Sequence, residues 1–224
     1  MPFLPERERG KAMPERKTVW LKSLYTIVFM TGLTALFITV LSALFLKTRP
    51  LIEINEAYDV KLAVLRAAGI SPESTEASDV ISLYDLLVEE KEFPAEKWNY
   101  YQVGAEEGLH AFVFPFRGAG LWGEIEGVLG YDASLEHITG MDILKQNETP
   151  GLGGRIGEDW FKDQFIGKQG PFTELTQNGG EEKLLYSFQA ITGATSTSAA
   201  FQSIINELIE KHVKALRRHL EEER

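Results

Sequence analysis

The longest hydrophobic run of the chain reads SLYTIVFMTGLTALFITVLSALFL and covers residues 23–46 without a charge. About 20 apolar residues suffice for a helix to cross the hydrocarbon core of a bilayer. A cleavable signal peptide has only ~7–15 apolar residues before a small-residue cleavage site. Here the run is longer, and Lys47 and Arg49 follow it directly. The pattern therefore predicts a retained transmembrane helix over residues 23–46.

Basic residues are unevenly distributed around this run. Cytoplasmic flanks of membrane helices are enriched in Lys and Arg. We therefore expect residues 1–22 to be a cytoplasmic tail and the bulk of the chain to lie on the other side of the membrane. Two basic residues, Lys47 and Arg49, follow the run, and six precede it: Arg7, Arg9, Lys11, Arg16, Lys17 and Lys22.

Two helical patterns follow the membrane run. The first covers residues 53–69 and ends at Gly69, a residue typical of helix ends. The second begins near Ser71 and Pro72, since proline is favoured in the first turn of a helix. We expect residues 47–96 to form a helical connector. The apolar positions that carry the two patterns are Ile54, Tyr58, Leu62 and Leu65, then Val80, Leu83, Leu86 and Leu87.

From Trp98 the pattern changes to short segments rich in β-branched and aromatic residues, separated by glycines: WNYYQV, LHAFVFPF, GEIEGVLGYD and HITGMDIL. This pattern predicts an antiparallel sheet. A short helix over residues 159–165, a strand within 183–191 and a closing helix over residues 198–220 follow. The prediction is an α+β domain over residues 97–224, an antiparallel sheet with flanking helices behind a single N-terminal transmembrane helix. The stripe of the closing helix is Phe201, Ile204, Ile205, Leu208, His212 and Leu216.

Composition excludes several classes of function. The formal net charge is −10, and residues 1–22 are net basic, so the remainder is more acidic than the whole chain. Nucleic acid is therefore not an expected partner, because phosphate binding needs a basic face. The chain has no cysteine, which excludes disulfides, thiolate-held clusters and a cysteine nucleophile. The four histidines are scattered, and we expect no metal site.

A cluster of hydroxyl side chains lies just before the closing helix, in ITGATSTSAAF, residues 191–201. The amino end of a helix exposes unpaired N–H groups and a partial positive charge, so a phosphate is favoured there. A threonine at this point can carry a phosphate-bearing cofactor as an ester. The alternative is simple capping, because Ser196, Thr197 and Ser198 are good N-cap residues.

Two glycine-rich stretches also stand out. In NETPGLGGRIG, residues 147–157, glycines permit close backbone approach and Leu152 lies between two of them. Taken alone, this stretch is equally typical of an ordinary turn. In GAGLWG, residues 118–123, Leu121 and Trp122 lie between glycines at a hairpin-like position, where a tryptophan more often belongs to the core.

Together these stretches resemble the FMN-binding subunits of two related bacterial respiratory complexes. These are the C subunit of the sodium-translocating NADH:quinone reductase (Nqr) and the G subunit of the Rnf complex. The family attaches FMN at D-x-x-[ST]-G-A-[ST], and this chain reads QAITGAT at residues 189–195. ETPGLG at residues 148–153 matches the family's flavin-contacting loop. GLWG and DWFKDQFIGK resemble Nqr more than Rnf. The resemblance covers the anchor and most of the chain beyond Leu109, with Gln189 in place of the usual Asp as the one departure.

The resemblance implies a cofactor, partners and a location. FMN would be bound covalently through its phosphate to Thr195, with Thr197 as the fallback acceptor. A separate flavin transferase would make this attachment. Electrons would pass between other subunits of an Nqr- or Rnf-type complex in the bacterial inner membrane, with the flavin domain on the periplasmic side. The residues implied in cofactor binding are Thr195, Thr192, Gly193, Ala194, Glu148, Thr149, Gly151, Leu152, Trp122 and Thr197.

In that assignment Leu152 and Trp122 would pack near the isoalloxazine, and Glu148 with Thr149 would make polar contacts to the ring or the ribityl chain. Two other classes stay open. The chain fits a membrane-anchored binding or assembly module without a redox role. A serine or threonine hydrolase is disfavoured, because the G-x-S-x-G elbow is missing from the sequence.

Overall fold

The computed structural model describes residues 16–105, 108–174 and 184–223, so residues 1–15 of the expected tail lie outside it. The chain divides into two compact units, Met1–Ile54 and Asn55–Arg224. The first helix, α1, runs over Arg16–Ala67. Its segment Trp20–Arg49 is the single described helix long and apolar enough to cross a membrane. Threonine hydroxyls inside it donate to carbonyls of the preceding turn, as Thr39 does to Ala35 O at 2.8 Å, which satisfies them without water.

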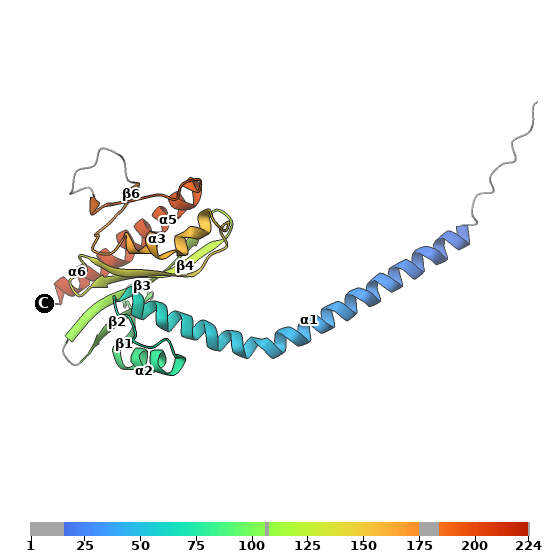
Figure 1. The fold of residues 1–224 in the computed structure, drawn as a ribbon, viewed down its shortest axis with the longest axis horizontal. Coiled ribbons are helices and arrows are strands. Elements are labelled where there is room, and N and C mark those ends of the chain that lie inside the picture. The colour runs from blue at the N-terminus through green and yellow to red at the C-terminus, as the bar shows by residue number, and fades with distance from the viewer. Residues whose placement is uncertain (1–15, 106–107, 175–183, 224) are drawn as a thin grey trace, which may run out of the picture. The chain divides into compact units, whose positions relative to one another are not determined.

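The second unit is built on a five-stranded antiparallel sheet in the order β1-β2-β3-β4-β5 (Figure 1). Its strands are β1 Val88–Glu92, β2 Asn99–Ala105, β3 Gly108–Ala119, β4 Glu124–Asp132 and β5 Ile138–Lys145. The predicted α+β class is confirmed. The expectation of an all-helical stretch up to residue 96 is wrong, since β1 lies within it and pairs from Val88↔Val103 to Glu92↔Asn99.

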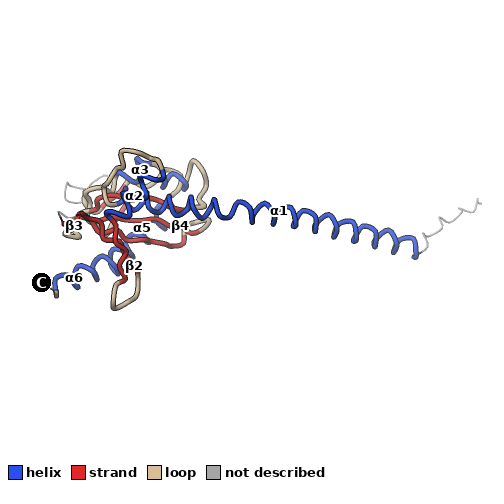
Figure 2. The backbone as a smooth tube through the Cα atoms, turned by 90° about the horizontal axis from the view of Figure 1, so that it is seen from below, coloured by secondary structure: helices blue, strands red, loops and turns tan. Residues whose placement is uncertain are grey.

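The sheet buries both faces, and alternation along β3 separates them. Phe112, Phe114 and Phe116 belong to the larger hydrophobic cluster, under helices α3 (Asp159–Asp163) and α5 (Thr195–Leu208). Ala111 and Val113 belong to the smaller cluster, with the last turns of α1. Figures 1 and 2 show the sheet between these helices. The larger cluster also contains Phe161, Phe165, Phe172, Phe188, Phe201, Ile205 and Leu208.

The end of α1 lies very close to the sheet because two glycines face it. A Cβ at Gly130 would lie 1.9 Å from Ala67 O, and one at Gly140 would lie 2.6 Å from Arg66 O. The Thr139 hydroxyl donates to Ala67 O at 2.6 Å. The helix ends at Ala67, two residues before the predicted Gly69, whose φ of +79° suits glycine just beyond a helix end.

The shorter elements differ from prediction in their bounds. Helix α2 covers Ala77–Leu87, so it does not begin at Ser71 or Pro72. The predicted short helix is α3, Asp159–Asp163, and it follows the 3-10 helix η1, Gly153–Gly157. The strand expected within residues 183–191 is reduced to β7, Ser187–Phe188, which pairs in parallel with β6, Thr173–Glu174; Lys183 lies outside the described residues.

The closing helix has three parts: α5 Thr195–Leu208, a π-helical turn η2 Ile209–Val213, and α6 Lys214–Glu222. The π turn adds a residue to one turn and shifts the buried stripe. The predicted stripe position His212 is therefore only half-buried and stacks on Trp98 at 4.5 Å, while Ile209 and Val213 are buried in its place.

Candidate functional site

Three loops that are separate in the sequence meet at one end of strands β3, β4 and β5. The first is the β3–β4 hairpin turn at residues 120–123, closed by the Gly120 N–H bond to Gly123 O at 2.7 Å. The second follows β5 and leads through residues 146–152 into η1. The third is the turn at residues 191–194, before α5. Each loop overlaps one of the three stretches that the sequence singled out.

The carboxylate of Glu148 lies where the three loops meet. The Trp122 N–H donates to Glu148 Oε1 at 3.0 Å, and the Thr197 hydroxyl donates to Glu148 Oε2 at 2.6 Å. Glu148 is only 4% exposed. Each of its oxygens therefore accepts a hydrogen bond within the protein, and the expected polar contact of this side chain to a cofactor stays a prediction.

Glycines make room for this carboxylate. A Cβ at Gly120 would lie 2.5 Å from Glu148 Oε1, and a Cβ at Gly153 would lie 2.4 Å from Thr197 Oγ1. Atoms at such distances must move apart, so neither position accepts a side chain without rearrangement. Gly151 has φ +74° and no atom within 4 Å of its Cβ direction, so this loop is open to solvent at that point. The glycines of the first two loops thus have specific roles beyond an ordinary turn.

The third loop turns sharply into α5. Gly193 has φ +80°, and the Ala194 N–H donates to Ile191 O at 2.9 Å. Helix α5 begins at Thr195 and its N-cap residue is Ala194, so no side chain caps it. The capping prediction for Ser196, Thr197 and Ser198 is therefore wrong, because all three lie inside the helix. Ser198 Oγ instead accepts the Ile191 N–H at 3.0 Å and secures the turn.

The hydroxyl groups of α5 differ in access. Thr195, in the first position of the helix, is exposed, whereas Thr197 is 1% exposed and bonded to Glu148. The first N–H groups of any helix lack partners within the helix. Thr195 therefore places an accessible hydroxyl beside free backbone donors. Thr197 has no accessible hydroxyl in this structure, so its fallback role as an acceptor stays an untested prediction that would need the start of the helix to rearrange.

Two of the loops carry exposed apolar side chains. Trp122 is 70% exposed and Leu152 is 43% exposed, so the alternative of a core tryptophan is wrong. Leu152 Cδ2 lies 3.3 Å from the Cβ direction of Gly193, which brings the second and third loops into contact. Of the other predicted site residues, Thr149, Gly151, Thr192 and Gly193 are exposed and Ala194 is buried.

Sequence reasoning missed two contacts of the site. The Glu148–Thr197 bond joins residues 49 positions apart, and nothing in their spacing signals it. Gln189 is held through its backbone, since its N–H donates to Gln164 Oε1 at 2.7 Å and its carbonyl accepts from Gln164 Nε2 at 3.3 Å. The Gln189 side chain is exposed.

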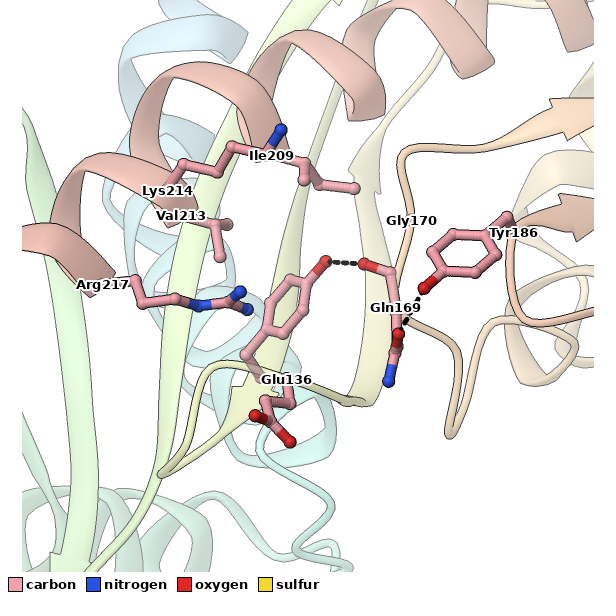
Figure 3. Close-up of a pocket in the computed structure, with 9 residues that line it drawn as sticks. Glu136, Gln169, Gly170, Tyr186, Ile209, Val213, Lys214 and Arg217 are labelled. Atoms are coloured by element: carbon pink, nitrogen blue, oxygen red, sulfur yellow. Dashed lines mark hydrogen bonds between the residues drawn. The ribbon is translucent and has the colours of Figure 1, made fainter. Parts of the chain in front are cut away.

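A separate pocket of about 250 Å³ lies between Gln169 and the last helical turns (Figure 3). The Tyr131 hydroxyl donates to Gln169 O at 2.8 Å and the Tyr186 hydroxyl to Gln169 Oε1 at 2.6 Å. Burial raises the pKa of Tyr131, which keeps this phenol a neutral donor. None of the predicted flavin residues lines this pocket, whose walls are Tyr131, Glu136, Gln169, Gly170, Tyr186, Ile209, Val213, Lys214 and Arg217.

Sequence comparison relates this part of the chain to flavin-binding proteins. Residues 120–210 match the family described as the FMN-binding domain. The C subunit of the Na(+)-translocating NADH-quinone reductase of Neisseria meningitidis is 32% identical over 114 residues, 48% of this chain and 44% of the relative. The G subunit of the Na(+)-translocating ferredoxin:NAD(+) oxidoreductase complex of Acetobacterium woodii is 39% identical over 92 residues, 41% of this chain and 44% of the relative. The matches thus span less than half the length of these two relatives.

Comparison of folds agrees with comparison of sequences. The crystal structure of the C subunit of the Na(+)-translocating NADH-quinone reductase from Parabacteroides distasonis superposes with a TM-score of 0.61 at 22% identity, covering 74% of this chain and 95% of that one. At this identity the likeness shows the fold. The resemblance of this chain to the FMN-binding subunits of Nqr and Rnf complexes is thereby confirmed, in sequence over residues 120–210 and in fold over most of the chain.

Proposed function

We propose that this chain carries FMN as a phosphoester on Thr195. The observation that supports this most strongly is the position of Thr195, an exposed residue that begins α5 two residues after Gly193. Helix amino ends favour anions through their free N–H groups and their partial positive charge. A phosphate esterified at this hydroxyl is therefore stabilised by the helix start itself.

The residues around Thr195 fit a flavin nucleotide. The exposed apolar surfaces of Trp122 and Leu152 suit a flat aromatic ring, and Leu152 lies beside Gly193, two residues before the acceptor threonine. Thr149 and Thr192 are exposed hydroxyl residues in the second and third loops. When bound, FMN supplies one- and two-electron transfer, which this chain's own side chains do not provide.

Attachment of FMN requires one substitution at phosphorus. The bond formed joins Thr195 Oγ1 to the phosphorus, and the bond broken joins that phosphorus to the leaving group of an activated flavin nucleotide. A flavin transferase would supply this donor and accept the hydroxyl proton. The chain gains the mass of FMN less one water.

We further propose that the chain is an electron-transfer subunit of a membrane oxidoreductase complex, an Nqr-type NADH:quinone reductase or, as the alternative, an Rnf-type complex. The two relatives are named as subunits of such complexes. Trp20–Arg49 would anchor the chain with its amino end in the cytoplasm and the flavin domain on the periplasmic side. Residues 23–46 hold no charge, so sodium passage would belong to other subunits.

The mass of the intact chain tests the attachment site. The full chain is produced in a bacterial membrane with and without a flavin transferase. We expect an FMN adduct in wild type and in Ser196→Ala with the transferase present, and none in Thr195→Val. A wild-type chain that stays colourless and unmodified would instead support the alternative of an assembly module without a redox role. Co-purified subunits, assayed for quinone-linked and ferredoxin-linked activity, separate Nqr from Rnf.

A further inference from the structure

We infer that Glu148 is the positioning residue of the flavin site: its buried carboxylate holds the hairpin turn and the start of α5 against the loop that carries Leu152. This inference rests on the proposed function, because it assigns these loops a common ligand. Of the flavin-directed residues, Trp122 and Leu152 belong to two different loops and Thr195 begins helix α5. Glu148 is bonded to the hairpin turn and to α5 and belongs to the loop of Leu152.

A carboxylate suits this position because both incoming groups are donors. Trp122 offers a backbone N–H and Thr197 offers a hydroxyl, and an ionised carboxylate accepts one hydrogen bond on each oxygen. No ion pair with Glu148 occurs among the described residues, so no cation competes for the carboxylate. Hydrogen bonds to a charged group are stronger than those between neutral groups, so the two bonds to Glu148 stabilise the contact between the loops.

The backbone of Glu148 is itself held in place. Its N–H donates to Gln146 Oε1 at 2.7 Å. Gly120 and Gly153 leave no room for a side chain beside the carboxylate, so the surrounding atoms fit around Glu148 closely. The carboxylate therefore has one position available. The hairpin turn and helix α5, which each donate a hydrogen bond to it, are fixed relative to that position.

The consequence for the site follows from sequence spacing. One of the hydrogen bonds that Glu148 accepts comes from the backbone N–H of Trp122 itself, so it fixes the backbone that carries the indole. Thr197 lies two residues after Thr195 on the same helix, so the second bond fixes the helix start that presents the acceptor hydroxyl. Leu152 follows Glu148 by four residues in the same loop. Breaking the junction frees all three side chains from one another.

The test uses the full chain with two substitutions of Glu148. Glu148→Ala removes both acceptors. Glu148→Gln keeps the shape, because the amide oxygen accepts from Trp122 and the amide NH2 donates to the Thr197 oxygen. The control is Val128→Ala, which opens a cavity in the smaller cluster on the opposite face of the sheet. Thermal unfolding is measured for each variant.

The first measurement is amide hydrogen exchange at residues 121–123 and 195–198 in flavin-free protein. We expect Glu148→Ala to speed exchange of the Trp122 amide by roughly 10- to 100-fold, and Glu148→Gln to stay within about threefold of wild type. Wild-type protection of this amide in Glu148→Ala overturns the inference. This measurement needs no cofactor, so it is decisive even if the chain proves to carry no FMN.

The second measurement is the rate of FMN attachment by the transferase, followed by intact mass. We expect a loss of roughly tenfold or more in Glu148→Ala, a rate near wild type in Glu148→Gln, and a rate near wild type in Val128→Ala despite its lower melting temperature. If Val128→Ala slows attachment as much as Glu148→Ala does, or if Glu148→Gln behaves like Glu148→Ala, the positioning role is wrong. If the wild-type chain is loaded with FMN and Glu148→Ala is loaded at the same rate, this inference alone is refuted and the proposed function stands.

Discussion

Replacing Gly130 with alanine tests how the end of α1 packs on the sheet. The new Cβ would lie 1.9 Å from Ala67 O, 2.5 Å from Ala67 C and 2.6 Å from Thr139 Oγ1. Two of these atoms are backbone, so relief requires the helix end to move away from the sheet. The movement breaks the 2.6 Å hydrogen bond from Thr139 to Ala67 O. It also loosens the smaller cluster, to which Ala63, Val64 and Ala67 belong.

The expected cost follows from these two losses. Overpacking of a core costs about 1–3 kcal/mol and a neutral hydrogen bond contributes about 1 kcal/mol. We therefore expect Gly130→Ala to lower the free energy of unfolding of the second unit by about 3 kcal/mol. For a unit of this size that corresponds to a fall in melting temperature of about 6–12 °C.

The assay is thermal unfolding of the detergent-solubilised chain, followed by tryptophan fluorescence. Gly157→Ala is the matched control, because no atom lies within 4 Å of its Cβ direction and its φ is not positive. We expect this control to melt within about 2 °C of wild type. A Gly130→Ala protein that melts with wild type, or a control that falls equally, would refute the argument from close packing.

Three further changes have defined outcomes. Asp142→Ala should cost about 3 kcal/mol in denaturant unfolding, because it leaves Lys162, only 11% exposed and 2.8 Å away, without its main partner; an unchanged midpoint contradicts this. Burial alone would raise the pKa of Asp132, but hydrogen bonds from Ser134 and from backbone amides outweigh it and lower that pKa. The stabilisation is therefore present above about pH 4 and is lost as the pH falls through the folded-state pKa, and Asp132→Asn should flatten this acid limb of the stability curve. Gln189→Asp restores the family pattern at an exposed side chain, so we expect faster FMN loading at an unchanged melting temperature.

The parts of the fold that the sequence predicted are those in which the apolar residues recur with a regular period. In β3, alternate phenylalanines point to the larger cluster, so a period of two was visible in the sequence. Strand β1, Val88–Glu92, was missed because it is an edge strand with charged residues and no buried position. The π turn at Ile209–Val213 was missed because a helical period of 3.6 assumes a uniform helix.

The site was predicted in its segments but not in its contacts. Residues of one motif lie close together in the sequence, so the three stretches were recognisable. The bonds that join them link Glu148 to positions 26 and 49 residues away, and only the packing of the loops brings these groups together. The solvent exposure of a side chain is equally invisible in the sequence, which is why the buried Thr197 was expected to serve as the fallback acceptor.

Helical geometry separates the hydroxyl groups of α5 and gives the last prediction. Two positions along a helix are about 200° apart, so Thr195 and Thr197 point to nearly opposite sides. One faces solvent, and the other is 1% exposed and donates to Glu148. In Thr195→Val we therefore expect no transfer of the flavin to Thr197, whereas Thr195→Ser should still be loaded because it keeps the hydroxyl at the same place. Peptide mapping of both variants after exposure to the transferase distinguishes the positions, and an adduct on Thr197 in the valine variant would show that the start of α5 unwinds to present a different face.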